Sequence, residues 1–271
     1  MTSRPARLTG FAAVLWLGAA PAFAVDISPH RALYSLSLAT TKSSSGVTAA
    51  SGAMVYEWGE TCDGWTVQQR FHLRLEYAEQ DNMEVSSTLV TWEAKSGMRY
   101  RFNERRLRNG ELDEEIKGEA KLDGVDKGGS AGFTKPEAAN LTLPAGTLFP
   151  TAHTLLLIQR AQAGDQFVSR KVFDGATVEN AGQITAVIGP ELKPGPSAAD
   201  EKLPKSPLLE RPSWRMRLAF FPAESKQEQP DYELGMRLLD NGVSQDMALD
   251  YGYYVIRAKL DDIEALPRPS C

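Results

Sequence analysis

The side chains whose types and spacing could do chemistry are few. His30, His72 and His153 are the three histidines, and none has a carboxylate or cysteine partner at the spacing of metal ligands. We therefore expect no metal site and no general base among them, and we expect His153 to hydrogen-bond locally in a helix. The sequence has no Gly-x-Ser-x-Gly motif, phosphate loop or dinucleotide fingerprint, and no cofactor is expected.

Two acidic residues, Glu233 and Asp250, are predicted to face each other on paired strands. Facing carboxylates can raise the pKa of one partner and make it a general acid. Like charges also face each other on hydrated strands, where water screens them. We expect no catalytic residues. The alternative is an enzyme that acts on peptidoglycan or lipid at the mouth of a barrel, using Asp250, Glu233 or His153.

The composition is that of an ordinary globular protein with an acidic balance. The chain has 271 residues, of which 42% are apolar and 24% charged, and its formal net charge is −5. Because phosphate neutralisation needs a basic face, an acidic chain is not expected to bind nucleic acid. No stretch after the first 24 residues reaches the roughly 18 apolar residues of a spanning helix, so we expect a protein that does not span the membrane.

The first 24 residues are predicted to be a signal peptide that is removed. Arg4 and Arg7 form a basic start, residues 8–20 are an apolar run too short to span a bilayer, and Ala22-Phe23-Ala24 suits a signal peptidase. A short membrane anchor is the disfavoured alternative, because no cysteine follows the run to take a lipid. Residues 25–271 are predicted to form one exported domain.

Export changes what the two cysteines mean. Cys62 lies in a turn and Cys271 is the last residue. In an oxidising compartment a bond between them would close a very long loop and typically contribute about 2–4 kcal/mol. Two free thiols or a metal site are the alternatives, and a metal site is disfavoured because no histidine or carboxylate cluster accompanies the cysteines.

Residues 65–77 alternate between apolar and polar side chains without a break. This period of two predicts a long strand with one wet face. Asp63-Gly64 directly before it suits a two-residue hairpin turn, and matching apolar faces sets the register. The predicted pairs are Tyr56 with Phe71 and Met54 with Leu73.

Asn-Gly turns predict two more hairpins, at positions 109–110 and 241–242. In both, the return strand sets apolar residues opposite apolar ones and arginines opposite acids. Three of the five arginines between 99 and 108 are neutralised in this way, which favours a structural role over binding of an anionic partner. The first hairpin pairs Leu107 with Leu112, Arg108 with Glu111, Arg106 with Asp113 and Arg105 with Glu114; the second pairs Met236 with Met247, Leu234 with Leu249, Tyr232 with Tyr251 and Arg237 with Asp246. Further strands are predicted over 32–39, 85–94, 167–173, 184–188, 214–221 and 253–260.

One segment of the chain is predicted to form a helix. Pro150 suits a first helical turn, residues 151–163 carry a broad apolar stripe at helical spacing, and Gly164 suits a left-handed stop. So broad a stripe indicates burial inside or across the sheet. Residues 190–212 contain six prolines and predict an exposed, largely unpaired loop.

Many long antiparallel strands must curl, because strand twist accumulates and open edges aggregate. A barrel of ten or more strands is wider than its own side chains can fill, so the helix is expected to plug it and leave a pocket beside it. The tentative ligand-binding residues are Met54, Tyr56, Phe71, Leu73, Met236 and Met247.

Six motifs occur in order along nearly the whole mature chain: HRALYSLSL at 30–38, CDGW at 62–65, LFPTAH at 148–153, FDG at 173–175, NGVSQD at 241–246 and LDYG at 249–252. Together they resemble the EipB cell-envelope integrity family. The resemblance implies a periplasmic protein of Gram-negative alphaproteobacteria, folded as a spiralling, incompletely closed β-barrel with a helix near its core. It also implies a disulfide between a cysteine in this turn and one at the extreme C-terminus, which Cys62 and Cys271 match. The family is associated with envelope maintenance and resistance to envelope stress, without an assigned reaction.

Together the residues and the resemblance predict a mainly β, antiparallel fold and a non-catalytic periplasmic binding or scaffold protein. Its expected ligand is apolar or amphipathic, either lipid or peptide, because the barrel volume is large and its lining is apolar and rich in methionine. A periplasmic protein docked on a strand edge is the other expected partner. An outer-membrane barrel shares the alternation but is disfavoured, because many strands carry charges on one face.

Overall fold

The computed structural model describes residues 25–194, 203–223 and 228–271 of the chain. The predicted signal peptide lies outside the described residues. One sheet of fifteen strands runs in the order β8-β7-β6-β5-β4-β3-β2-β1-β15-β14-β13-β12-β11-β10-β9. All neighbours are antiparallel except β9 and β10. The strands are β1 His30–Thr41, β2 Val47–Glu60, β3 Gly64–Tyr77, β4 Met83–Ala94, β5 Arg99–Arg108, β6 Glu111–Leu122, β7 Gly129–Lys135, β8 Ala139–Leu143, β9 Thr147–Leu148, β10 Phe167–Val172, β11 Gly182–Leu192, β12 Ser213–Phe221, β13 Tyr232–Leu239, β14 Ser244–Asp250 and β15 Tyr254–Ala265.

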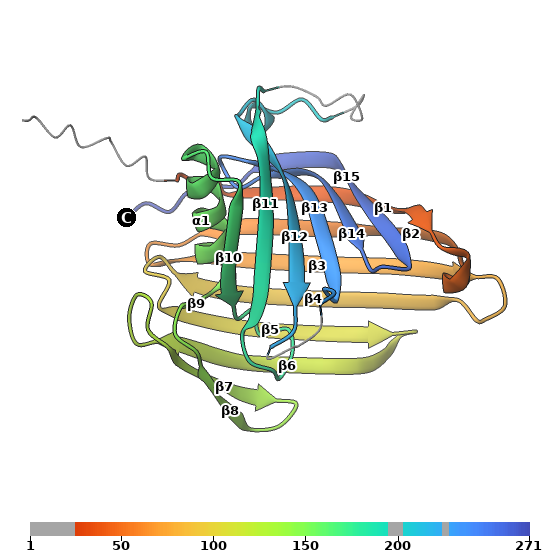
Figure 1. Ribbon diagram of the computed structural model, residues 1–271, viewed down its shortest axis with the longest axis horizontal. Coiled ribbons are helices and arrows are strands. Elements are labelled where there is room, and N and C mark those ends of the chain that lie inside the picture. The colour runs from red at the N-terminus through yellow and green to blue at the C-terminus, as the bar shows by residue number, and fades with distance from the viewer. Residues whose placement is uncertain (1–24, 195–202, 224–227) are drawn as a thin grey trace, which may run out of the picture.

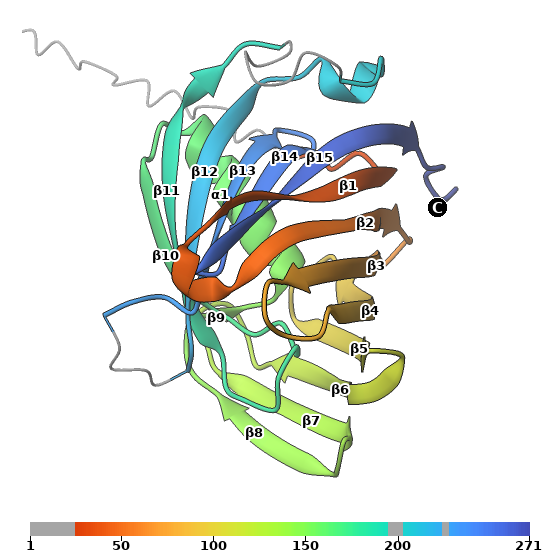
Figure 2. The same ribbon diagram turned by 90° about the vertical axis from the view of Figure 1, so that its right-hand side faces the viewer.

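The sheet curls back over itself into a nearly closed barrel with a seam. In Figure 1 the strands β2 to β6 run across those of β10 to β13, so the two halves of the sheet face each other with crossing directions. The helix α1, Pro150–Gln162, lies inside the bend of the sheet, as Figure 2 shows. The predicted mainly β barrel with one helix packed in it is therefore confirmed.

The seam is closed by aromatic packing between the early and late strands. The Phe173 ring, directly after β10, meets Phe102 of β5 and Phe133 of β7 with ring centroids 5.6 and 6.2 Å apart. The Tyr100 hydroxyl donates to the Asp174 carbonyl at 2.9 Å. Buried aromatic area of this kind holds together two sheet ends that no backbone ladder joins.

The helix has the predicted bounds and an unexpected cap. It begins at Pro150, and Gly164 follows its end with φ of +83°, a conformation that suits glycine. Glu93 of β4 accepts hydrogen bonds from the backbone N–H groups of Thr151 at 2.7 Å and Ala152 at 2.8 Å. A carboxylate from another element thus satisfies N–H groups that a helix start leaves free. Burial raises the pKa of Glu93 to about 7.

The hairpin predicted at Asp63-Gly64 has a longer turn than expected. Glu60 pairs with Trp65 and Met54 with Phe71, so the loop has four residues and the predicted register is wrong by two. The loop is closed by Thr61, whose N–H donates to the Gly64 carbonyl at 2.8 Å. Because a shift by two keeps every side chain on its face, the predicted inward and outward faces still hold.

The other two hairpins have the predicted turns, and each departs from the predicted register near its turn. In the hairpin at 241–242, Met236 pairs with Met247 and Leu234 with Leu249 as predicted, and a shift of one residue then places Leu238 opposite Ser244. In the hairpin at 109–110, Leu107 pairs with Leu112 and Arg108 with Glu111 as predicted. A bulge then places Arg106 opposite Glu114 and Arg105 opposite Glu115, so the two predicted arginine pairs are wrong by one residue.

The segment 190–212 is less exposed than its prolines predict. β11 extends to Leu192, which pairs with Ser213. Leu209 is only 6% exposed, and the Asn241 side chain donates to the Leu208 carbonyl at 3.0 Å. The described end of this segment therefore docks on the β13–β14 turn.

Candidate functional site

A cavity of about 600 Å³ lies between the two halves of the sheet. Its volume is within the usual range for small-molecule sites. It is lined by alternate, inward-pointing positions of neighbouring strands, so the period of two along each strand builds its wall. The strands contribute His30, Tyr34 and Leu36 of β1, Met54, Tyr56 and Trp58 of β2, Gln69 and Phe71 of β3, Val85 and Ser87 of β4, Glu104 and Arg106 of β5, Tyr232, Leu234, Met236 and Leu238 of β13, and Ser244, Met247 and Leu249 of β14; Tyr251 directly after β14, Thr154 of α1 and Gly242 complete the lining.

The structure brings five of the six predicted ligand-binding residues together at this cavity. They come from β2, β3, β13 and β14, which face each other across the interior, and their role in binding stays a prediction. Leu73 does not line the cavity. It pairs with Gly52 and packs in a core cluster at 5% exposure. The five lining residues are Met54, Tyr56, Phe71, Met236 and Met247.

Two charged residues of the cavity, Glu104 and Arg106, were missed by the sequence analysis. The Arg106 guanidinium donates to Glu104 at 3.0 Å and to Glu114 of β6 at 3.0 Å. Burial raises the pKa of Glu104, and Arg106 partly opposes this. The signal was in the strand itself: with Tyr100 and Phe102 directed inward, a period of two directs residues 104 and 106 inward as well.

Aromatic side chains gather beside this ion pair. The Tyr232 ring stacks on Phe220 with centroids 4.2 Å apart and lies 6.2 Å from the Tyr251 ring. Tyr251 is 37% exposed, and it lies close enough to Arg106 that the guanidinium lowers the pKa of its phenol, against the larger effect of burial. This end of the cavity is therefore both aromatic and polar.

The opposite end of the cavity carries no charge at neutral pH. His30 is 1% exposed, its Nδ1 lies 2.8 Å from the Ser28 carbonyl, and burial lowers its pKa. A neutral imidazole there sits among the rings of Tyr56 and Trp58, with centroids 6.2 and 6.4 Å away. Apolar contact is what this end offers to a ligand.

The residues named for a catalytic alternative are not assembled into one site. Glu233 does pair with Asp250, as predicted, but Arg217 forms ion pairs with both carboxylates. These are outward positions of β13 and β14, because their neighbours point into the cavity. His153 is buried in α1, where burial lowers its pKa to about 4, and its Nε2 has no hydrogen-bond partner among the described residues.

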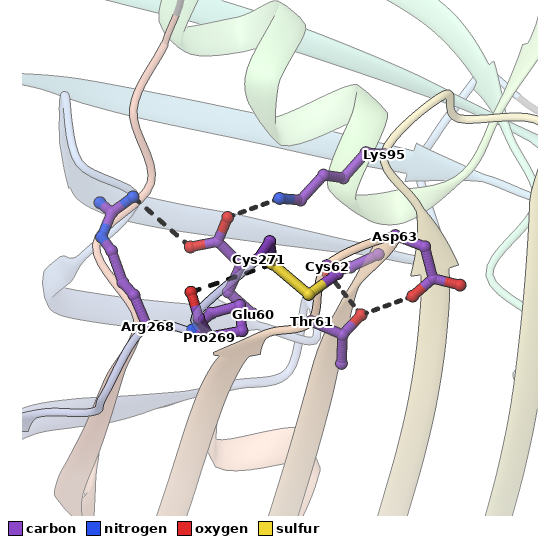
Figure 3. Close-up of a disulfide and its surroundings, with 9 residues drawn as sticks. Glu60, Thr61, Cys62, Asp63, Lys95, Arg268, Pro269 and Cys271 are labelled. Carbon is purple, nitrogen blue, oxygen red and sulfur yellow. Dashed lines mark hydrogen bonds and ion pairs between the residues drawn. A yellow bond between two sulfur atoms is a disulfide. The ribbon is translucent and has the colours of Figure 1, made fainter.

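Cys62 and Cys271 form a disulfide, as Figure 3 shows. It fastens the tail of the chain to the β2–β3 turn. An ion-pair network lies beside it: Glu60 meets Lys95 at 2.7 Å and Arg268 at 3.4 Å. Arg268 also holds Asp26 at 2.9 Å, so both ends of the described chain are tied to one corner of the barrel.

The described residues contain neither a metal-binding cluster nor a helix that could span a membrane. No group of three or more histidine, cysteine or acidic side chains in that part of the chain could hold a metal ion. No helix within the same residues is long and apolar enough to cross a membrane.

Comparison with known proteins decides the family. The model of the EipB-like family matches residues 21–267. This chain belongs to the EipB-like family. Its relative in Brucella abortus (strain 2308), a cell envelope integrity protein, is 32% identical over 261 residues, which cover 94% of this chain and 91% of the relative.

A solved structure from Brucella abortus is similar to this chain in fold. It is described as a beta-barrel-like protein of a domain of unknown function. It superposes with a TM-score of 0.82 at 30% identity, covering 90% of this chain and all of that one. The two similar proteins are named for envelope integrity and for a barrel fold, and neither name is that of an enzyme.

Proposed function

We propose that this EipB-like protein acts in the periplasm as a non-catalytic binding or scaffold protein that supports the integrity of the cell envelope. Its interior cavity holds an apolar or amphipathic ligand, either a lipid or a peptide. The envelope role rests on the similarity to the cell envelope integrity protein of Brucella abortus. The ligand rests on the cavity.

The observation that carries the binding role is the open apolar surface that lines the interior cavity. Tyr56, Phe71 and Met247 are partly exposed, yet their open surface faces the cavity rather than the outside of the barrel. Leaving such surface in contact with water costs roughly 25 cal/mol per Å². An apolar ligand that covers this surface would recover the free energy, so the lining of the cavity favours an apolar ligand.

Native mass spectrometry of protein purified from its own host without detergent tests the proposal. We expect the wild-type protein to carry a bound lipid or peptide. Met247→Trp directs an indole into the cavity and should displace the ligand by steric overlap with the part of it that packs on β14. Thr88→Trp is the matched control, since Thr88 is exposed on the outward face of β4 and should leave the ligand bound.

The same variants test the link to the envelope. In a strain that lacks the protein, we expect Thr88→Trp to restore resistance to envelope stress and Met247→Trp to fail while still folding, as checked by circular dichroism. A wild-type protein without any bound mass, together with full rescue by Met247→Trp, would contradict the proposal.

A further inference from the structure

The geometry points to the chemical class of the occupant: we propose that the cavity selects amphiphiles with a positively charged head group and rejects those with an anionic one. The inference rests on the proposed function, which supplies the apolar tail. It follows from where the charges of the cavity lie and from their sum.

Charge is confined to one end of the cavity. Glu104 and Arg106 are the only acidic or basic residues among the described side chains that line it, apart from the neutral His30. β1, which carries His30, and β5, which carries Arg106, are separated by four strand spacings, roughly 19 Å measured along the curved sheet at about 4.8 Å per strand. A ligand with one polar and one apolar end therefore has a single favourable orientation, with its head at Arg106 and its tail toward Trp58 and α1.

The arginine at this end is already engaged by carboxylates. One guanidinium nitrogen donates to Glu104 and another to Glu114, each at 3.0 Å. The Arg106 side chain is 33% exposed and that of Glu104 12%, so the pair is largely withdrawn from bulk water. An anionic head group would have to compete with two carboxylates for one cation, and a close like charge is unfavourable.

A third carboxylate adds to this excess. Asp174, directly after the seam residue Phe173, is near enough to raise the pKa of both Glu104 and Tyr232. The Ala176 N–H donates to the Asp174 carboxylate at 3.0 Å, and burial raises the pKa of Asp174 itself. Glu104 and Glu114 against the Arg106 guanidinium give this end a net charge of −1 when all three are ionised, and an ionised Asp174 adds to it.

The rings beside the cluster suit the same kind of head group. Tyr232 and Tyr251 line the cavity next to Arg106, and Tyr251 is partly open to solvent. Aromatic faces attract ammonium groups, and this attraction grows when the group is withdrawn from water. The carboxylates can pair with the positive charge of a substituted ammonium group, and the aromatic rings can pack against its methyl groups.

Three probes that share one dodecyl chain separate the contribution of the apolar tail to binding from that of the head group. Dodecyltrimethylammonium, dodecyl maltoside and dodecyl sulfate are titrated below their critical micelle concentrations into the delipidated, disulfide-bonded mature protein, with calorimetry as the readout and circular dichroism to confirm that the fold persists. We expect the ammonium probe to bind at least about tenfold more tightly than the sulfate, with the maltoside between them. Added salt should shrink this ratio, because it screens the charges.

Variants locate the selectivity. Glu114→Gln, at a side chain that is 37% exposed, should reduce the ratio without unfolding the protein, and Glu104→Gln should reduce it further. Glu115→Gln is the matched control, because that neighbour points to the other face of β6 and should leave the ratio unchanged.

The outcomes are distinct. Equal binding of all three probes, or tighter binding of the sulfate that is lost in Arg106→Met, would overturn the head-group inference and leave the proposed function standing. Failure of all three probes to bind the wild-type protein would overturn both.

Discussion

At the scale of single residues, two buried groups beside α1 respond to pH in opposite directions. Glu93 caps the start of the helix, and burial raises its pKa from 4.5 to about 7. His153 lies one turn further on, and burial lowers its pKa from 6.5 to about 4. Each pKa differs between the folded and unfolded chain, so each makes stability depend on pH.

Glu93 favours the folded state at low pH. Because its folded pKa is raised, the stability that it contributes is present below pH 4.5 and is lost as the pH rises through about 7. We expect urea unfolding of the wild-type protein to lose on the order of 1–3 kcal/mol over this range relative to Glu93→Gln, which cannot titrate. Parallel pH profiles of the two proteins would mean that Glu93 titrates normally.

His153 acts in the reverse direction. Its folded pKa is lowered, so its contribution is present above pH 6.5 and is lost as the pH falls through about 4. His153→Phe keeps the ring and removes the titration, and it also removes the Nε2 atom that lacks a partner. We expect the variant to be about as stable as the wild type at pH 7.5 and more stable at pH 5, by urea unfolding. A variant that loses stability equally at both values would indicate a packing role alone.

At the scale of elements, the faces of the strands could be predicted and their exact registers could not. Apolar alternation fixed which side chains of β3 point inward, because the side-chain period of a strand is two. The four-residue loop after Glu60 and the bulge between Arg106 and Leu107 depend on backbone geometry that no apolar pattern encodes. That bulge is one reason why the Arg106–Glu114 pair was missed.

Turns that hold elements together can be tested at Gly175. It follows β10 with φ of +69°, and a Cβ there would lie 2.5 Å from the Phe102 ring of β5. We expect Gly175→Ala to cost about 2 kcal/mol or more in denaturant unfolding, because it combines backbone strain with a clash at the seam.

Gly110 provides the matched control for the seam. Its φ is +81°, and a Cβ there would meet nothing within 4 Å. Gly110→Ala should therefore cost only about 1 kcal/mol, the strain of the backbone conformation. Equal losses in the two variants would show that contact with Phe102 contributes nothing.

At the scale of the whole molecule, the barrel, the helix inside it and the disulfide could be predicted. The short strands β7, β8 and β9 could not, because Gly129–Lys135 and the residues after it show little alternation and β9 has only two residues. The charged end of the cavity was also missed, since it forms only where β5 meets β13 and β14 across the interior.

The disulfide is expected to stabilise the whole barrel. It links residues separated by 209 positions, so its loss frees a very large loop in the unfolded chain. We expect the double variant Cys62→Ser and Cys271→Ser to lose about 2–4 kcal/mol in urea unfolding, and the reduced wild type to match it. A double variant as stable as the oxidised wild type would show that the ion pairs of Glu60 hold the tail by themselves.

The pairing of β1 with β15 has a consequence for how the chain is made. β1 and β15 lie side by side in the sheet, so this junction can form only after residues 254–265 have been synthesised. Each half of the chain can build its run of neighbouring hairpins early, whereas the meeting of the two halves is a long-range and slow event. The interior chamber exists only after that last step, and an occupant taken up during assembly would be enclosed as the first and final strands zip together.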